Sequence, residues 1–141
     1  MKHIVYFFLL IFSSTACTSN TLVNIKSWES VEINTLNIKI KEAYSSELKW
    51  TSKPEFYVFY LFDLSNLKNV SYEYSADSIE NPKEININLV RDGFLDDSIR
   101  GDIQRIKLAK NNNGEWEVSS LHRATSCWRN EALVYSSEAC P

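Results

Sequence analysis

The feature that most constrains this chain is the turn signal Asn111-Asn112-Asn113-Gly114, which lies between two segments of alternating polarity. Asn and Gly tolerate the positive φ angles that tight hairpin turns require. In segments 103–110 and 115–121, apolar residues alternate with more polar ones, as in a strand with one buried face. The pattern predicts an antiparallel hairpin, so the fold must contain an antiparallel sheet.

Further segments extend this prediction. Residues 84–91 alternate cleanly, residues 69–76 alternate less strongly, and Asn81-Pro82 and Asp92-Gly93 are turn signals. Residues 55–64 are the most apolar stretch after the N-terminus, and we expect them to form a central strand covered on both faces. No long crossover helix is indicated. We therefore expect one β-rich α+β domain, with a curved antiparallel sheet of about six strands and at most one or two helices.

Residues 30–48 fit two structures. Ile33, Leu36, Ile40, Tyr44 and Leu48 are spaced by three and four, as on one helix face. Segments 31–35 and 36–40 also alternate and are rich in β-branched residues, which favours two strands joined by a turn. The sequence leaves both open, with a slight preference for strands over 31–41.

The composition fits a single packed domain. The chain has 141 residues, 44% of them hydrophobic, and a net charge of −3. This mild acidity argues against a nucleic-acid-binding protein. Three glycines form no phosphate-binding loop, and the motifs of serine hydrolases and His-pair metal sites are absent. We therefore predict no cofactor and no resident metal, and we favour a non-enzymatic protein.

The N-terminus has the three parts of a secretory signal. Lys2 supplies a positive start, Ile4 to Phe12 are nine consecutive apolar residues, and small residues follow before Cys17. Nine residues are too few to cross a membrane, which takes about 20. We expect a signal peptide over residues 1–16 that is removed by cleavage.

Ser14-Thr15-Ala16-Cys17 resembles the lipobox of bacterial lipoproteins, although that family usually has Leu where this chain has Ser14. The resemblance implies a diacylglyceryl group on Cys17, with palmitate-type acylation of the new N-terminus. Because residues 18–26 are polar, we expect a lipid-anchored tether over 17–26, followed by a single globular domain over 27–141. Two or more acyl chains hold a protein stably at a membrane. Ordinary signal-peptidase cleavage after Ala16 is the alternative. Thr18, in place of the Asp that retains lipoproteins at the inner membrane, favours the periplasmic side of the outer membrane.

The cysteine count agrees with this interpretation. The mature chain contains Cys17, Cys127 and Cys140, an odd number for an exported protein. Lipidation of Cys17 would leave Cys127 and Cys140 to form a disulfide bond in an oxidising periplasm. A zinc site built from cysteine and His122 has too few ligands at recognisable spacing.

One acidic cluster has functional potential. Segment 55–102 contains ten acidic and four basic residues, and its acids are concentrated between residues 92 and 102. Such carboxylates hold a hard cation or form a general acid/base pair, although their spacing is not that of an EF-hand. A solvated loop neutralised by Arg91 and Arg100 is the simpler interpretation. The candidate ligands are Asp92, Asp96, Asp97 and Asp102.

Residues 91–141 also resemble the C-terminal half of a family of small exported bacterial proteins, through RDGFLDDSIRGD, NNNGEWEV, SCWRN and ACP. The resemblance implies no activity, but it places Cys127 and Cys140 where that family has its pair. Trp28, Trp50 and Trp128 lie outside the clear strands and either line a groove or pack over sheet edges.

Together these features favour a lipid-anchored cell-envelope protein that binds a partner protein or assists envelope assembly. Two alternatives stay open from the sequence. The first is a periplasmic immunity or inhibitor lipoprotein. The second is a metal-binding or hydrolytic enzyme that uses the acidic residues between Asp92 and Asp102.

Overall fold

A computed structural model describes residues 23–130 and 132–141. The expected signal peptide, Cys17 and most of the expected tether lie outside these residues. The elements, in chain order, are β1 (Asn24–Ile25), β2 (Glu29–Ser30), α1 (Asn34–Ser45), the 3-10 turns η1 (Lys49–Ser52) and η2 (Pro54–Phe56), α2 (Val58–Leu61), β3 (Asn69–Ala76), β4 (Glu84–Asp92), β5 (Ile99–Lys110), β6 (Trp116–Cys127) and β7 (Val134–Tyr135).

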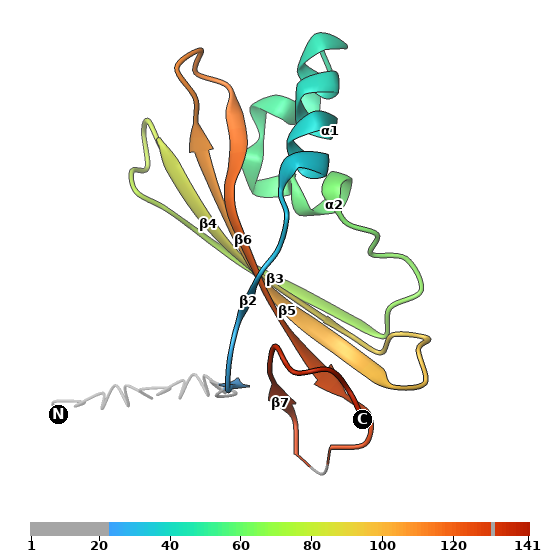
Figure 1. Ribbon diagram of the computed structural model, residues 1–141. Coiled ribbons are helices and arrows are strands. Elements are labelled where there is room, and N and C mark those ends of the chain that lie inside the picture. The colour runs from blue at the N-terminus through green and yellow to red at the C-terminus, as the bar shows by residue number, and fades with distance from the viewer. Residues whose placement is uncertain (1–22, 131) are drawn as a thin grey trace, which may run out of the picture.

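The strands form an open, twisted five-stranded sheet in the order β2-β6-β5-β4-β3, with every neighbouring pair antiparallel (Figure 1). A second, two-stranded sheet joins β1 and β7 in parallel. The prediction of a single β-rich α+β domain with an antiparallel sheet and few helices is confirmed. The hairpin of β5 and β6 turns where expected, and Gly114 has a positive φ of 79°.

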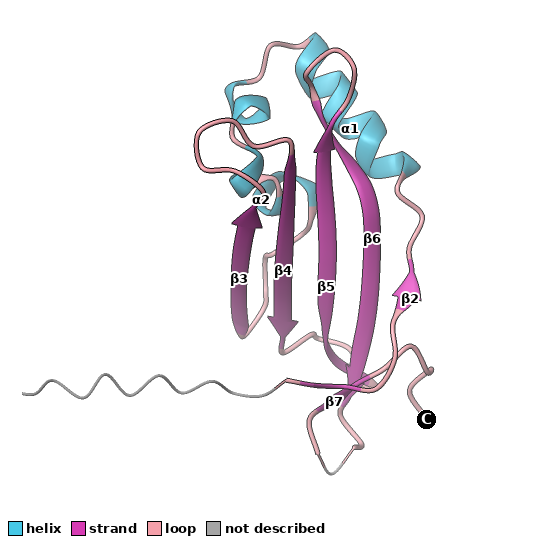
Figure 2. Cartoon of the chain, turned by 90° about the vertical axis from the view of Figure 1, so that its left-hand side faces the viewer, coloured by secondary structure: helices cyan, strands magenta, loops and turns pink. Residues whose placement is uncertain are grey.

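Two apolar layers lie on opposite faces of the sheet. The larger core lies under the helices, which are gathered over one end of the sheet (Figure 2), and is built on Ile87, Leu89, Ile106 and Leu108. The smaller cluster lies on the other face, where β1 and β7 cover Ile103 and Ala124. Residues 24 and 25, which the sequence analysis assigned to the tether, are therefore part of the folded domain.

The preference for strands over 31–41 is wrong, because residues 34–45 form α1. The residues at helical spacing are the ones that face the larger core. Ile40 is buried, and Ile33, Leu36 and Tyr44 pack around it. The carboxylate of Glu32 accepts hydrogen bonds from the first amides of the helix. Burial of this apolar face outweighs the weak helix propensity of the β-branched residues.

The central strand expected over 55–64 is also wrong. Pro54 begins a 3-10 turn that leads directly into α2. Tyr57, Val58 and Leu61 are buried, a spacing of one and three that fits a helical turn. A short run that is apolar at nearly every position does not distinguish a strand from a helical turn, because both periods match it.

Candidate functional site

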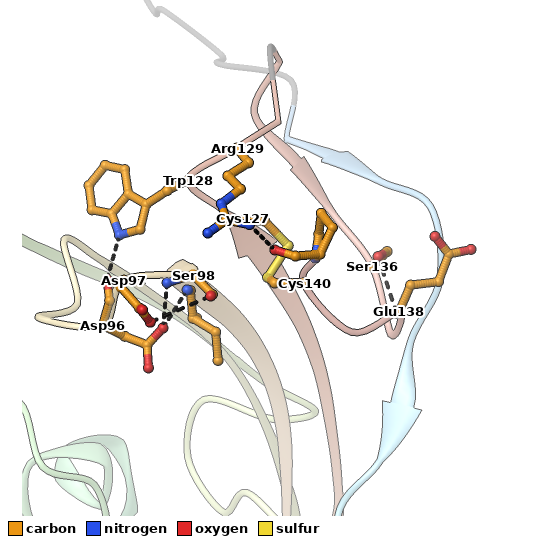
Figure 3. Close-up of a disulfide and its surroundings, with 11 residues drawn as sticks. Asp96, Asp97, Ser98, Cys127, Trp128, Arg129, Ser136, Glu138 and Cys140 are labelled. Atoms are coloured by element: carbon orange, nitrogen blue, oxygen red, sulfur yellow. Dashed lines mark hydrogen bonds between the residues drawn. A yellow bond between two sulfur atoms is a disulfide. The ribbon is translucent and has the colours of Figure 1, made fainter.

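The disulfide predicted from the sequence is present. Cys127 and Cys140 are bonded, with their Cα atoms 5.5 Å apart. The bond joins the end of β6 to the C-terminal segment, and the acidic loop lies beside it (Figure 3). The carbonyl oxygen of Pro141 accepts a hydrogen bond from Arg129, which further ties down the end of the chain.

The four candidate acids are divided among separate structural roles. Asp102 is buried and accepts two hydrogen bonds from Arg91, at 2.9 and 2.6 Å, plus one from the amide of Gln104. Asp92 accepts a hydrogen bond from Arg100 at 2.9 Å. This bond holds the pKa of Asp92 below its ordinary value, so folding stabilises the charged carboxylate.

Asp96 and Asp97 lie in the loop between β4 and β5. The carboxylate of Asp96 accepts the backbone amides of Ile99 and Ser98, which lower its pKa, and its carbonyl accepts the indole N–H of Trp128. Asp97 is exposed. Both line a shallow, polar cleft of about 420 Å³ beside the disulfide.

Asp92 and Asp102 therefore serve as partners for arginines, and Asp96 as a partner for backbone amides. Within residues 23–130 and 132–141, no three His, Cys, Asp or Glu side chains are grouped so that they could hold a metal ion. The simpler sequence interpretation, in which Arg91 and Arg100 neutralise their neighbours, describes Asp92 and Asp102 correctly, except that Asp102 is buried.

Both arginines also contact aromatic rings. The guanidinium of Arg91 lies 5.8 Å from the ring centre of Phe62 and 5.2 Å from that of Phe94. Arg100 lies 5.6 Å from the ring of Trp128. Planar guanidinium groups combine such stacking with hydrogen bonds to carboxylates, two of them from Arg91 and one from Arg100, which fixes the arginines in place. Sequence spacing gave no signal for these contacts, because the rings come from separate loops.

The other residues singled out from the sequence, one histidine and the tryptophans, contact side chains of neighbouring elements. His122 lies 3.4 Å from the hydroxyl of Ser30, across the pair of β6 and β2. Trp28 packs beneath the guanidinium of Arg105 on the face covered by β1 and β7. Trp50 stacks on Tyr60 with ring centres 4.7 Å apart. The three tryptophans therefore do not line one common groove.

An exposed aromatic surface, which the sequence did not indicate, lies on the helix-covered side of the sheet, next to β3. It combines rings from η2 and α2 with side chains of β3. The ring of Phe59 packs edge-to-face against that of Tyr72, with ring centres 5.3 Å apart. We call this the β3 aromatic surface. Its members are Phe56, Phe59, Tyr60, Val70, Tyr72 and Tyr74, and all except the half-buried Tyr72 are more than a third exposed.

The β3 aromatic surface lies beside a groove of about 560 Å³ that reaches the loop between β3 and β4, where Ile79 is fully exposed. Exposed apolar patches that are rimmed by polar residues typically mark sites of protein association. The apolar run over 55–64 contains three of these rings, Phe56, Phe59 and Tyr60. The expectation of a strand buried on both faces did not predict that they are exposed.

Comparisons with protein-family models, with curated protein sequences and with solved structures give no match.

Proposed function

We propose that this protein is a lipid-anchored component of the bacterial cell envelope that binds a partner protein and carries out no catalysis. The disulfide between Cys127 and Cys140 is the observation that carries the proposal. It uses two of the three mature cysteines and leaves Cys17, at the lipobox-like position, as the attachment residue. Disulfides of this kind persist in oxidising compartments such as the periplasm.

The position of β1 supports an anchor at this end of the chain. Six residues, 18–23, separate Cys17 from β1, a distance of at most about 25 Å when fully extended. β1 lies on the sheet face opposite the helices. An anchored domain would therefore hold that face toward the membrane, with the helices and the β3 aromatic surface directed away from it.

A binding role is supported by the contrast between paired acidic residues and exposed aromatic residues. The conspicuous acids already pair with Arg91 and Arg100, whereas the β3 aromatic surface is exposed. Aromatic side chains supply much of the binding energy at protein interfaces. Among the described helices, none is long and apolar enough to cross a membrane.

Metabolic labelling with palmitate tests the anchor. The wild-type chain is expected to incorporate label, to partition into the detergent phase of Triton X-114 and to accumulate as a precursor when globomycin is added. A Cys17→Ser variant should lose the label, while Cys127→Ser should keep it. A Cys17→Ser protein that is processed to the wild-type size and stays membrane-bound would contradict the proposal.

A further inference from the structure

The two edges of the main sheet differ in how far other parts of the chain cover them. The β6 edge is covered, because β2 pairs with it at His122 and Arg123, and α1 satisfies its backbone further along. The side chain of Asn37 bonds both the N–H and the carbonyl of Val118, and the hydroxyl of Tyr44 accepts the N–H of Trp116. Covering an edge in this way prevents pairing with another chain.

The opposite edge is β3, which stands last in the strand order and has exposed residues along nearly its whole length. Its sequence, NVSYEYSA, contains no proline and a single charged residue, Glu73. Natural edge strands are usually interrupted by proline, bulges or several charges. β3 has none of these features, and its register with β4 is regular over eight residues.

In the antiparallel ladder of β3 and β4, hydrogen-bonded and non-hydrogen-bonded residue pairs alternate. This alternation shows which backbone groups of β3 face away from β4, where another strand could bond to them. Asp77 donates its N–H to Glu84, its partner in the register that pairs Ala76 with Ile85. Odd-numbered residues of β3 therefore direct their N–H and C=O groups toward β4, and even-numbered residues direct theirs outward. The outward residues are Val70, Tyr72, Tyr74 and Ala76. Their side chains lie on the helix-covered face, because they pair with β4 residues of the larger core.

We propose that β3 pairs antiparallel with β3 of a second copy, about a two-fold axis that passes through Tyr72. In this register Tyr72 lies opposite Tyr72 of the second copy, and Val70 lies opposite Tyr74. Glu73 then faces Ser71 on the polar side. Aromatic and β-branched residues that face each other across strands stabilise a sheet. The two aromatic surfaces meet at the axis.

Other registers are less favourable. Moving the axis to Glu73 would place two carboxylates directly opposite each other, which is destabilising. Moving it by half a residue would join the apolar face of one copy to the polar face of the other. The strand is thus complementary to itself in shape and polarity.

The same axis is compatible with two lipid anchors. A two-fold axis perpendicular to the sheet keeps both β1–β7 layers on one side, so both tethers would face the same membrane. Attachment to one membrane also raises the local concentration of the copies. The inference depends on the proposed binding role and identifies the partner as a second copy of this chain.

Cysteine crosslinking in the intact, membrane-bound chain tests the register. Cα atoms of a hydrogen-bonded antiparallel pair lie about 5.5 Å apart, which is within disulfide range. Tyr72→Cys should therefore give a reducible dimer on mild oxidation. Val70→Cys and Tyr74→Cys, alone, would hold their thiols about 13 Å from the same residue in the second copy and should stay monomeric. Co-expression of these two variants should restore the crosslink.

Equal crosslinking at all three positions, no crosslinking at any, or a crosslink to a different protein would overturn the proposal. Detergent partition of the same samples reports the anchor separately, so loss of the dimer and loss of the anchor give different results.

A backbone test does not depend on introduced thiols. Tyr74→Pro removes an N–H that faces outward and leaves the β3–β4 ladder intact, so it should abolish the native dimer in chemical crosslinking. Tyr74→Val also removes the ring but keeps the N–H and introduces a β-branched side chain that suits a strand, so it should retain the dimer. Equal dimer yields in the two variants would contradict edge pairing.

Discussion

Arg91 and Asp102 form the most enclosed ion pair found in the described residues, with side-chain exposures of 15% and 3%. Removing one partner of a buried pair leaves a charge without compensation, which typically costs about 3–5 kcal/mol. Asp102→Asn should lower the free energy of unfolding by this amount in urea denaturation. Lys107→Ala breaks the exposed pair with Glu84 and should cost at most about 1 kcal/mol. Equal effects of the two substitutions would contradict the structural role of Asp102.

The pairing of Asp92 with Arg100 predicts a pH dependence. The pKa of Asp92 is lowered by folding, so its contribution is complete above the pKa of the unfolded chain and is lost as pH falls through the folded value. The stability difference between wild type and Asp92→Asn should be constant from pH 7 to about 5 and should shrink below about pH 4. A difference that persists unchanged to pH 2 would show that the charge of Asp92 is not involved.

At the residue scale, the sequence predicted which residues have a structural role better than it predicted the contacts that those residues make. The bond between Cys127 and Cys140 followed from the cysteine count. The burial of Asp102 did not follow, because an acid in an acidic segment is usually solvated, whereas this one is enclosed together with its partner Arg91. Contacts between residues far apart in the sequence leave no periodic signal.

At the element scale, α1 shows how packing determines secondary structure. Ile40 is 2% exposed, whereas Ile38, two residues away, is 57% exposed. Ile40→Ala should lower the free energy of unfolding by about 2–5 kcal/mol, because it leaves a cavity in the larger core. Ile38→Ala is the matched control and should be nearly neutral. Similar costs at both positions, measured by urea denaturation, would favour the discarded two-strand structure.

The strands were predicted well and the helices poorly. Segments 69–76, 84–91 and 103–110 lie in β3, β4 and β5, and segment 115–121 lies in β6 except for Glu115, because alternation and turn residues are local signals. Residues 31–41 and 55–64 were misassigned because their apolar residues satisfy both periods. Tertiary contacts, including the bonds of Asn37 to β6, decide between the two structures.

At the scale of the whole molecule, the sequence predicted the fold class but not its asymmetry. One sheet edge is covered by β2 and α1, and the other is β3. Which strand lies at an edge depends on the order of strands in space, and one sequence does not specify that order. The same asymmetry places the β3 aromatic surface and the proposed pairing strand next to each other.

The central claim is that Cys17 becomes the lipidated first residue of the mature protein. Mass spectrometry of the N-terminal peptide, from protein extracted from the envelope fraction, tests it most directly. We predict a peptide that begins at Cys17 and carries the added mass of a diacylglyceryl group and an amide-linked acyl chain. A peptide that begins at Cys17 without added mass, or one that retains residues before Cys17, would contradict the claim.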